Sequence, residues 1–149
     1  LARVIEQYKI APNRLELEIT ESTIMENPED LEGELNAMSA MGLTLAIDDF
    51  GSGFSSLNYL KRLPVDVLKI DRMFIKDLEE DESDRAIVTG IIALASSLGL
   101  DTVAEGVETE YQYNLLQTLG CDTCQGYYFS KPVPVVDFEE KYLKQVVTV

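Results

Sequence analysis

Short apolar runs of the kind that form strands recur five times along this chain. They cover residues 15–20, 43–47, 65–70, 102–105 and 124–129. Between these runs, apolar residues recur at the three- and four-residue spacing of amphipathic helices, and glycine ends three of the helical stretches. The repeated alternation predicts βα units, whose strands pair in parallel.

Helical spacing also marks both ends of the chain. Residues 1–8 are typical of the end of a helix, and Val135, Phe138, Tyr142 and Val146 indicate a closing helix. The acidic run 79–82 is interpreted as the solvated start of another helix.

The predicted fold class is α/β, a partial TIM-like (β/α) barrel of about five strand-helix units with mostly parallel strands. A complete barrel has eight units and about 250 residues, whereas this chain has 149. We therefore expect residues 1–149 to form a single incomplete domain. Its two exposed sheet edges and uncovered inner face favour pairing with a second copy, as a homodimer, or with a missing amino-terminal part.

Polar or charged residues stand where the predicted strands end. They are Glu18 and Glu21, Asp48 and Asp49, Lys69, Glu105, and Gln125. Because the carboxyl ends of parallel strands converge on one mouth of a barrel, we expect these side chains to share a site. A cluster of carboxylates needs a cation, and oxygen ligands favour a hard ion such as Mg²⁺ or Mn²⁺.

Composition narrows the chemistry further. The formal net charge of −15 argues against a nucleic-acid polymer as partner, but a small phosphate-bearing ligand remains compatible with an acidic mouth that holds metal ions. The chain contains no histidine, so within it a histidine base or a histidine-rich zinc site is excluded.

Structural explanations compete for some of these residues. The pair Asp48 and Asp49 suits a helix N-cap and turn as well as a metal site. Lys69 could form an ion pair with Asp71, since residues two apart on a strand share a face.

Cys121 and Cys124 form a C-x-x-C motif, which suits redox chemistry in some folds. Here the motif leads into a strand-like run instead of opening a helix, so a structural role is favoured. Free thiols suit a reducing cytosol, and no apolar run approaches the length of a membrane span. We expect a cytoplasmic domain, which could still belong to a membrane-anchored parent.

Five short motifs occur in an order and at intervals that together resemble one family. They are EITE at 18–21, DDFGSGFSSL at 48–57, KID at 69–71, AEGVE at 104–108 and QGYYFSKP at 125–132. The chain resembles the carboxyl-terminal part of the EAL family of cyclic di-GMP phosphodiesterases, without the first three barrel strands.

The resemblance implies hydrolysis of cyclic di-GMP to linear pGpG with Mg²⁺ or Mn²⁺. It implies that Glu18, Asp48, Asp49 and Glu105 are metal ligands. Glu105 and Gln125 would complete the site near the attacking water, with Glu105 as candidate base, while Lys69 would hold that water or the charge on phosphate.

The resemblance also assigns supporting roles. Glu21 would brace the loop 50–57, which in the family links the site to dimerisation, and Ser52 and Phe54 replace the more usual Thr and Tyr of that loop. Four further residues would lie near the substrate: Asp71, Glu108, Gly126 and Pro132. Upstream sensor or cyclase domains are possible in the parent protein.

One departure from the family limits the expected activity. The Glu-Ala-Leu motif and a later Asn supply metal ligands in the family, and neither occurs in this sequence. We expect the isolated chain to be inactive as a hydrolase. Two alternatives stay open: an inactive cyclic di-GMP-binding or protein-interaction module, and an enolase-like or Schiff-base lyase in which Lys69 is the reactive group.

Overall fold

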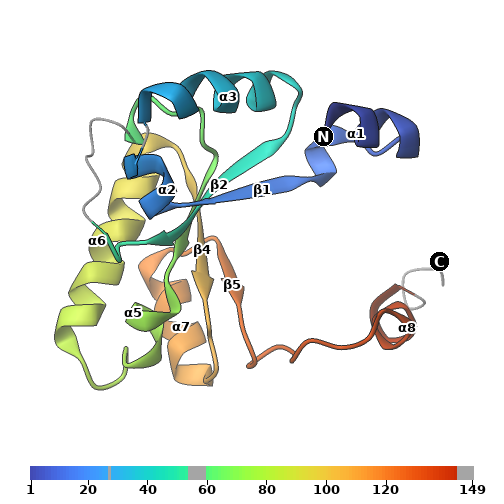
Figure 1. Ribbon diagram of the computed structural model, residues 1–149. Coiled ribbons are helices and arrows are strands. Elements are labelled where there is room, and N and C mark those ends of the chain that lie inside the picture. Colours follow the sequence, from blue (N-terminus) through green and yellow to red (C-terminus); the bar gives the residue numbers. More distant parts are fainter. Residues whose placement is uncertain (27, 54–59, 144–149) are drawn as a thin grey trace.

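A five-stranded parallel sheet forms the centre of the molecule (Figure 1). The computed structural model describes residues 1–26, 28–53 and 60–143. The strands, in sheet order, are β1 (Glu16–Thr20), β2 (Thr44–Phe50), β3 (Val67–Ile70), β4 (Asp101–Glu105) and β5 (Thr123–Gln125). All four pairings are parallel and each strand lies beside its neighbour in sequence, which confirms the predicted fold class.

Helices cover one face of this sheet. They are α2 (Glu21–Glu26), α3 (Pro28–Ala40), α5 (Arg72–Lys76), α6 (Glu82–Leu98) and α7 (Glu110–Leu119). Alternate strand residues pack against them, among them Leu45, Ile47, Leu68 and Ile70, each at most 2% exposed. The intervening residues therefore point to the opposite face, because successive strand side chains alternate.

Local capping sets the boundaries of the long helices. Asp81 caps α6, with its carboxylate accepting from two backbone amides, and Thr109 and Gln112 form a capping box at the start of α7. Gly99 and Gly120 follow these helices in the left-handed conformation, at φ 72° and 86°. The predicted helix stops at these two glycines are confirmed.

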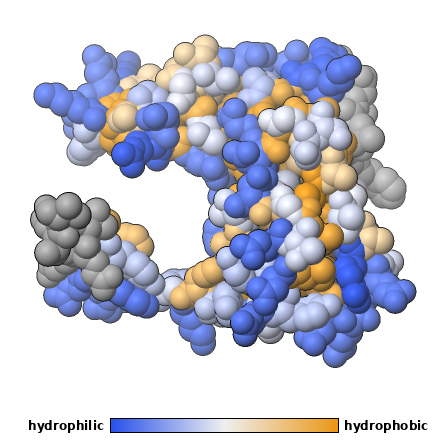
Figure 2. All heavy atoms as spheres, turned by 180° about the vertical axis from the view of Figure 1, so that it is seen from behind, coloured by the Kyte–Doolittle hydropathy of each residue, from blue (hydrophilic) through white to orange (hydrophobic). Residues whose placement is uncertain are grey.

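Both terminal segments extend away from the sheet (Figure 1). At the amino end lie α1 (Ala2–Tyr8) and the short helix η1 (Pro12–Arg14); at the carboxyl end lie α8 (Val135–Phe138) and η2 (Glu139–Leu143). The expected closing helix is thus two short pieces, with Val135 72% and Phe138 47% exposed, and Val146 lies outside the described residues. Figure 2 shows open space between the carboxyl-terminal segment and the body.

Several predicted boundaries were wrong. Strand β2 continues through Asp48 and Asp49 to Phe50, so the acidic pair lies within the strand and not in a turn or N-cap after it. Glu21, which follows β1 directly, is the first residue of α2. Strand β5 ends at Gln125, because the Tyr128 amide turns back to donate to the Val107 carbonyl.

Among the described helices, none is long and apolar enough to cross a membrane.

Candidate active site

Lys69 lies at the centre of the candidate site. Its side chain is 5% exposed, and its Nζ lies 2.6 Å from Glu18 Oε1, 2.8 Å from Glu105 Oε1 and 3.1 Å from Asp48 Oδ1. The three carboxylates come from β1, β4 and β2, and Lys69 comes from β3. The parallel register thus brings together four of the residues that the sequence analysis selected, on the face of the sheet that the helices leave open.

The surroundings of Lys69 keep it charged. Burial alone would lower the pKa of its ammonium, but the hydrogen bonds that it donates to Glu105, Glu18 and Asp48 raise that pKa well above 10.5. A Schiff-base or proton-abstracting lysine must instead be neutral. The geometry therefore does not support the lyase interpretation.

Lys69 does not form its recorded ion pairs with Asp71, the neighbour that the sequence offers as a structural partner. Asp71 Oδ1 accepts from the Met73 amide at 2.8 Å and so caps α5. The recorded ion pairs of Lys69 go instead to residues on three other strands. A local pair between Lys69 and Asp71 is therefore not what holds this lysine.

Asp49 occupies a distinct place beside this cluster. It lies in an irregularity of the β2–β3 pairing and has a φ of 53°, which is unusual for a residue other than glycine. Partial desolvation of the carboxyl, then the neighbouring charges of Asp48 and Asp71, raises the pKa of Asp49, while Lys69 opposes the shift. Asp49 is exposed, so it stands at the mouth and not around the ammonium.

The donor set is suited to a divalent cation, although the side chains are arranged around Lys69. Asp48 Oδ1 is buried, and its ion pair with Lys69 Nζ, at 3.1 Å, is the longest of the three. A buried carboxylate oxygen is costly unless a cation compensates it, and here the Lys69 ammonium does so. Within residues 1–26, 28–53 and 60–143, however, no group of three or more acidic or thiol side chains has the geometry to hold a metal by itself.

Gln125 lies beside Glu105, with which it pairs in register at the end of β5. The next residue, Gly126, passes so close to Val107 that a Cβ there would overlap the Val107 backbone. The Val107 amide donates to the Gln125 carbonyl at 3.0 Å, and the Val107 carbonyl accepts from Tyr128. Gly126 is therefore required by packing, and it sets the position of Gln125 at the mouth.

A pocket of about 170 Å³ adjoins Glu105 and Gln125. Its lining residues are Arg72, Glu105, Gly106, Glu108, Gln125, Gly126 and Tyr127. It thus contains two of the residues expected near substrate, Glu108 and Gly126. Arg72 is not among the site residues predicted from the sequence, although its place directly after the KID motif is a usable signal.

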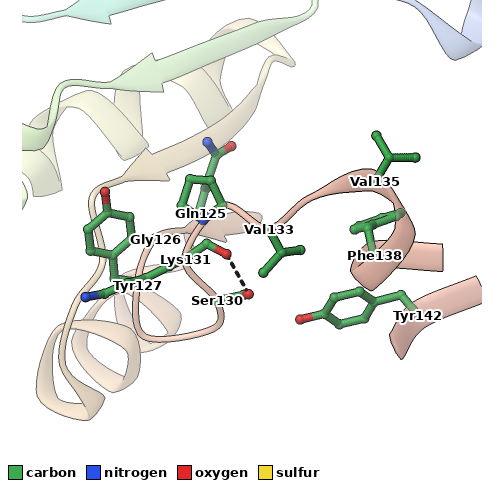
Figure 3. Close-up of a pocket in the computed structure, with 10 residues that line it drawn as sticks. Gln125, Gly126, Tyr127, Ser130, Lys131, Val133, Val135, Phe138 and Tyr142 are labelled. Carbon is green, nitrogen blue, oxygen red and sulfur yellow. Dashed lines mark hydrogen bonds between the residues drawn. The ribbon is translucent and has the colours of Figure 1, made fainter. Parts of the chain in front are cut away.

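The remaining expected residues lie around this centre. Glu21 is 2% exposed, and its Oε2 accepts from the amides of Gly51 at 2.9 Å and Gly53 at 3.3 Å. These are contacts that a bracing role requires, but Phe54 and the rest of the loop through residue 57 lie outside the described residues. Pro132 lines a larger pocket of about 510 Å³, where Phe138 and Tyr142 face the loop after β5 (Figure 3).

Cys121 and Cys124 are both free thiols. Burial, followed by the nearby Cys121, raises the pKa of the Cys124 thiol to about 11. A reactive thiol needs a lowered pKa. The geometry therefore supports the structural interpretation of this motif.

Comparison with known proteins gives a consistent result. The model of the EAL domain family matches residues 1–132. The bifunctional diguanylate cyclase/cyclic di-GMP phosphodiesterase MucR of Pseudomonas aeruginosa is 50% identical over 128 residues, which are 86% of this chain and 19% of MucR. The chain thus spans about a fifth of the length of that relative.

Solved structures extend the likeness to three dimensions. The MucR phosphodiesterase in complex with cyclic di-GMP matches 92% of this chain and 56% of its own, with a TM-score of 0.90 and 47% identity. A manganese and cyclic di-GMP complex of BlrP1 from Klebsiella pneumoniae matches 87% of this chain and 33% of its own, with a TM-score of 0.81 and 33% identity.

Proposed function

The chain belongs to the EAL domain family, and we propose that it supplies part of a metal-dependent phosphodiesterase that hydrolyses cyclic di-GMP to linear pGpG. The observation that carries this proposal is the meeting of Lys69 with Glu18, Asp48 and Glu105 at the carboxyl ends of parallel strands. The cyclic di-GMP complexes of the two structural relatives support the choice of ligand.

Four carboxylates are suited to hold the metal: Glu18, Asp48, Asp49 and Glu105. The oxygens of Glu18, Asp48 and Glu105 meet within 3.1 Å of one point, Lys69 Nζ, and all four side chains offer the oxygen ligands that Mg²⁺ or Mn²⁺ prefers. When bound, a divalent cation supplies positive charge for the phosphoryl oxygens and makes water a stronger nucleophile at neutral pH.

The protein side chains have separate tasks in this reaction. Lys69 remains an ammonium whose three N–H groups hold three carboxylates in place. When the half-exposed Glu18 turns away, the N–H that it frees donates to the attacking water or to a phosphate oxygen. Glu105 is the candidate base, because its Oε1 is oriented by Lys69 at 2.8 Å and its side chain stays 23% exposed to an incoming water. The Gln125 amide, next to Glu105 in register, orients the same water.

The site needs residues from outside this chain. A closed barrel has eight strands, and the five here leave β1 and β5 as open edges. We propose that this piece is inactive alone and pairs with a missing amino-terminal part that carries the Glu-Ala-Leu motif and the Asn. Homodimerisation, an upstream sensor or cyclase domain, and a cytoplasmic position belong to the same proposal for the parent protein.

One observation favours a second candidate, a module that binds cyclic di-GMP without turnover. The carboxylates of Glu18, Asp48 and Glu105 converge on Lys69, and the described residues contain no preformed metal-holding group. With its carboxylates paired to Lys69, the chain would bind metal weakly but would still present the surface that contacts cyclic di-GMP.

The test is a comparison of turnover and binding in the complete EAL domain that contains this chain. We expect the wild-type protein to release pGpG in the presence of Mg²⁺ or Mn²⁺, and we expect this release to stop when EDTA is added. Glu105→Gln should lower turnover about 10²- to 10⁴-fold while cyclic di-GMP still binds, and Glu79→Gln in the exposed acidic turn is the control. Binding without product by the wild type would favour the module; neither binding nor product would refute both.

A further inference from the structure

Strand β5 is very short for a strand that carries a site residue. It contains only Thr123–Gln125, and within the described part of this chain it pairs with β4 alone. The register places Gln125 opposite Glu105, so the two side chains point to the same face of the sheet. A strand of this length has few ladder hydrogen bonds with which to fix its register, so contacts at its two ends must contribute.

Side-chain hydrogen bonds join the amino ends of β4 and β5. Asp122 Oδ2 accepts from the Thr102 amide at 2.8 Å and from the Thr102 hydroxyl at 2.7 Å. Thr102 Oγ1 accepts in turn from the Asp122 amide at 3.1 Å. We call these three contacts the Thr102–Asp122 clasp. Thr102 is 2% exposed, and hydrogen bonds to a carboxylate are stronger than those between neutral groups.

The clasp lies at a matching interval from the site on both strands. Thr102 stands three residues before Glu105, and Asp122 stands three residues before Gln125. These equal intervals agree with the register in which Glu105 and Gln125 are partners. A slip of one residue would turn Gln125 toward the helices and would bring Cys124, which packs against the core, to the open face. The clasp therefore selects the register that the site needs.

The carboxyl end of β5 has a different kind of anchor. There the Val107 amide donates to the Gln125 carbonyl, and the Tyr128 amide donates to the Val107 carbonyl, each at 3.0 Å. These bonds join main-chain groups, which nearly every residue type supplies. The clasp depends instead on one hydroxyl and one carboxylate. The amino end is therefore the place where side-chain identity specifies how β5 pairs with β4.

Resting on the function proposed above, we propose that Thr102 and Asp122 are positioning residues, which act through the register of β5 to hold the Gln125 amide beside Glu105. Both lie at the amino ends of their strands, away from the mouth. In the proposed reaction Gln125 orients the attacking water, and a displacement of about 1 Å in such a group costs up to about 10²-fold in rate. Loss of the clasp should thus lower kcat more than it changes KM.

The test is a double-mutant cycle in the complete EAL domain, with release of pGpG in Mg²⁺ as the readout. Thr102→Val removes the hydroxyl and keeps the shape, and Asp122→Ala removes the acceptor at an exposed position. We expect each to lower kcat about 10- to 100-fold and to change KM less than about threefold. In a Gln125→Ala background, either substitution should change kcat less than about threefold, because the group that the clasp positions is already gone.

Two further variants separate positioning from general stability. Thr102→Ser keeps the hydroxyl and should stay within about threefold of the wild-type kcat. Thr118→Val is the matched control, since the Thr118 hydroxyl donates to the Asn114 carbonyl at 2.8 Å on exposed α7, and kcat and KM should both be unchanged.

Three results would overturn the proposal. They are equal fractional losses of kcat in the wild-type and Gln125→Ala backgrounds, an unchanged kcat in both Thr102→Val and Asp122→Ala, and a loss in Thr102→Ser as large as that in Thr102→Val. A wild-type domain that binds cyclic di-GMP or not but releases no pGpG would refute the proposed function itself, a result separate from any effect of the variants.

Discussion

Replacement of Lys69 by Met gives the most direct test of the site. The substitution keeps the length of the side chain and removes the charge that lies within 3.1 Å of three carboxylates. The oxygens that converge on Nζ lie within about 6 Å of one another, and two unit charges at that distance repel by about 3 kcal/mol at an effective dielectric of about 20.

The net loss should be smaller than the sum of these repulsions. Glu18 is 47% exposed and can turn into solvent, whereas Asp48 and Glu105 are only 21% and 23% exposed and must stay close together. We therefore expect Lys69→Met to lower the free energy of unfolding by about 3–5 kcal/mol, as for other buried ion pairs that lose one partner.

The assay is urea unfolding of the complete EAL domain in EDTA, followed by circular dichroism. The control is Lys76→Met, since Lys76 is 70% exposed and lies 3.8 Å from Asp77, a pair worth at most about 1 kcal/mol. Because folding raises the pKa of Lys69, its contribution is complete below the ordinary pKa of 10.5 and is lost as the pH rises through the folded value. The difference between wild type and variant should thus be constant from pH 6 to 9 and shrink in strong alkali. A loss no larger than that of Lys76→Met would refute the reasoning.

Three further predictions concern the surroundings of the site. Gly126→Ala should lower the free energy of unfolding by about 1–3 kcal/mol in urea titrations, because the new Cβ meets the Val107 backbone. Gly90→Ala is the control: Gly90 has open space around it, so this substitution should raise the free energy of unfolding by about 0.5–1 kcal/mol. An equal effect of the two substitutions would contradict the packing argument. Cys124, with its pKa raised to about 11, should react with iodoacetamide at pH 8 about 100-fold more slowly in the folded protein than in urea; similar rates measured by mass spectrometry would disprove its burial. Glu21→Ala should cost about 1.5–3 kcal/mol in thermal unfolding, because two backbone amides lose a charged acceptor, and an unchanged melting temperature would rule out bracing.

The order of the strands and the carboxylates at their ends could be read from the chain alone. Consecutive parallel βα units permit few strand orders, and an acidic side chain at the carboxyl end of a buried strand must lie at the mouth of the sheet. For this reason the sequence alone predicts that Glu18, Asp48 and Glu105 share a site, and the structure brings them together at Lys69.

Other features depend on contacts between distant segments. The irregularity that carries Asp49 arises from a shift in the pairing of β2 with β3. The early end of β5 arises from hydrogen bonds between its following turn and Val107. Neither leaves a pattern in the local run of apolar residues, because contacts with a neighbouring segment decide both.

The sequence by itself therefore determined the fold class, the family and the face on which the acids gather, since periodicity and local motifs act over a few neighbouring residues. Only the tertiary structure decided that Lys69 is enclosed by three strands' carboxylates and that Arg72 pairs with Glu108, 36 residues away. The physical reason is that hydrogen bonds and charges act through space, and the separation of two residues along the chain does not limit their distance in the fold.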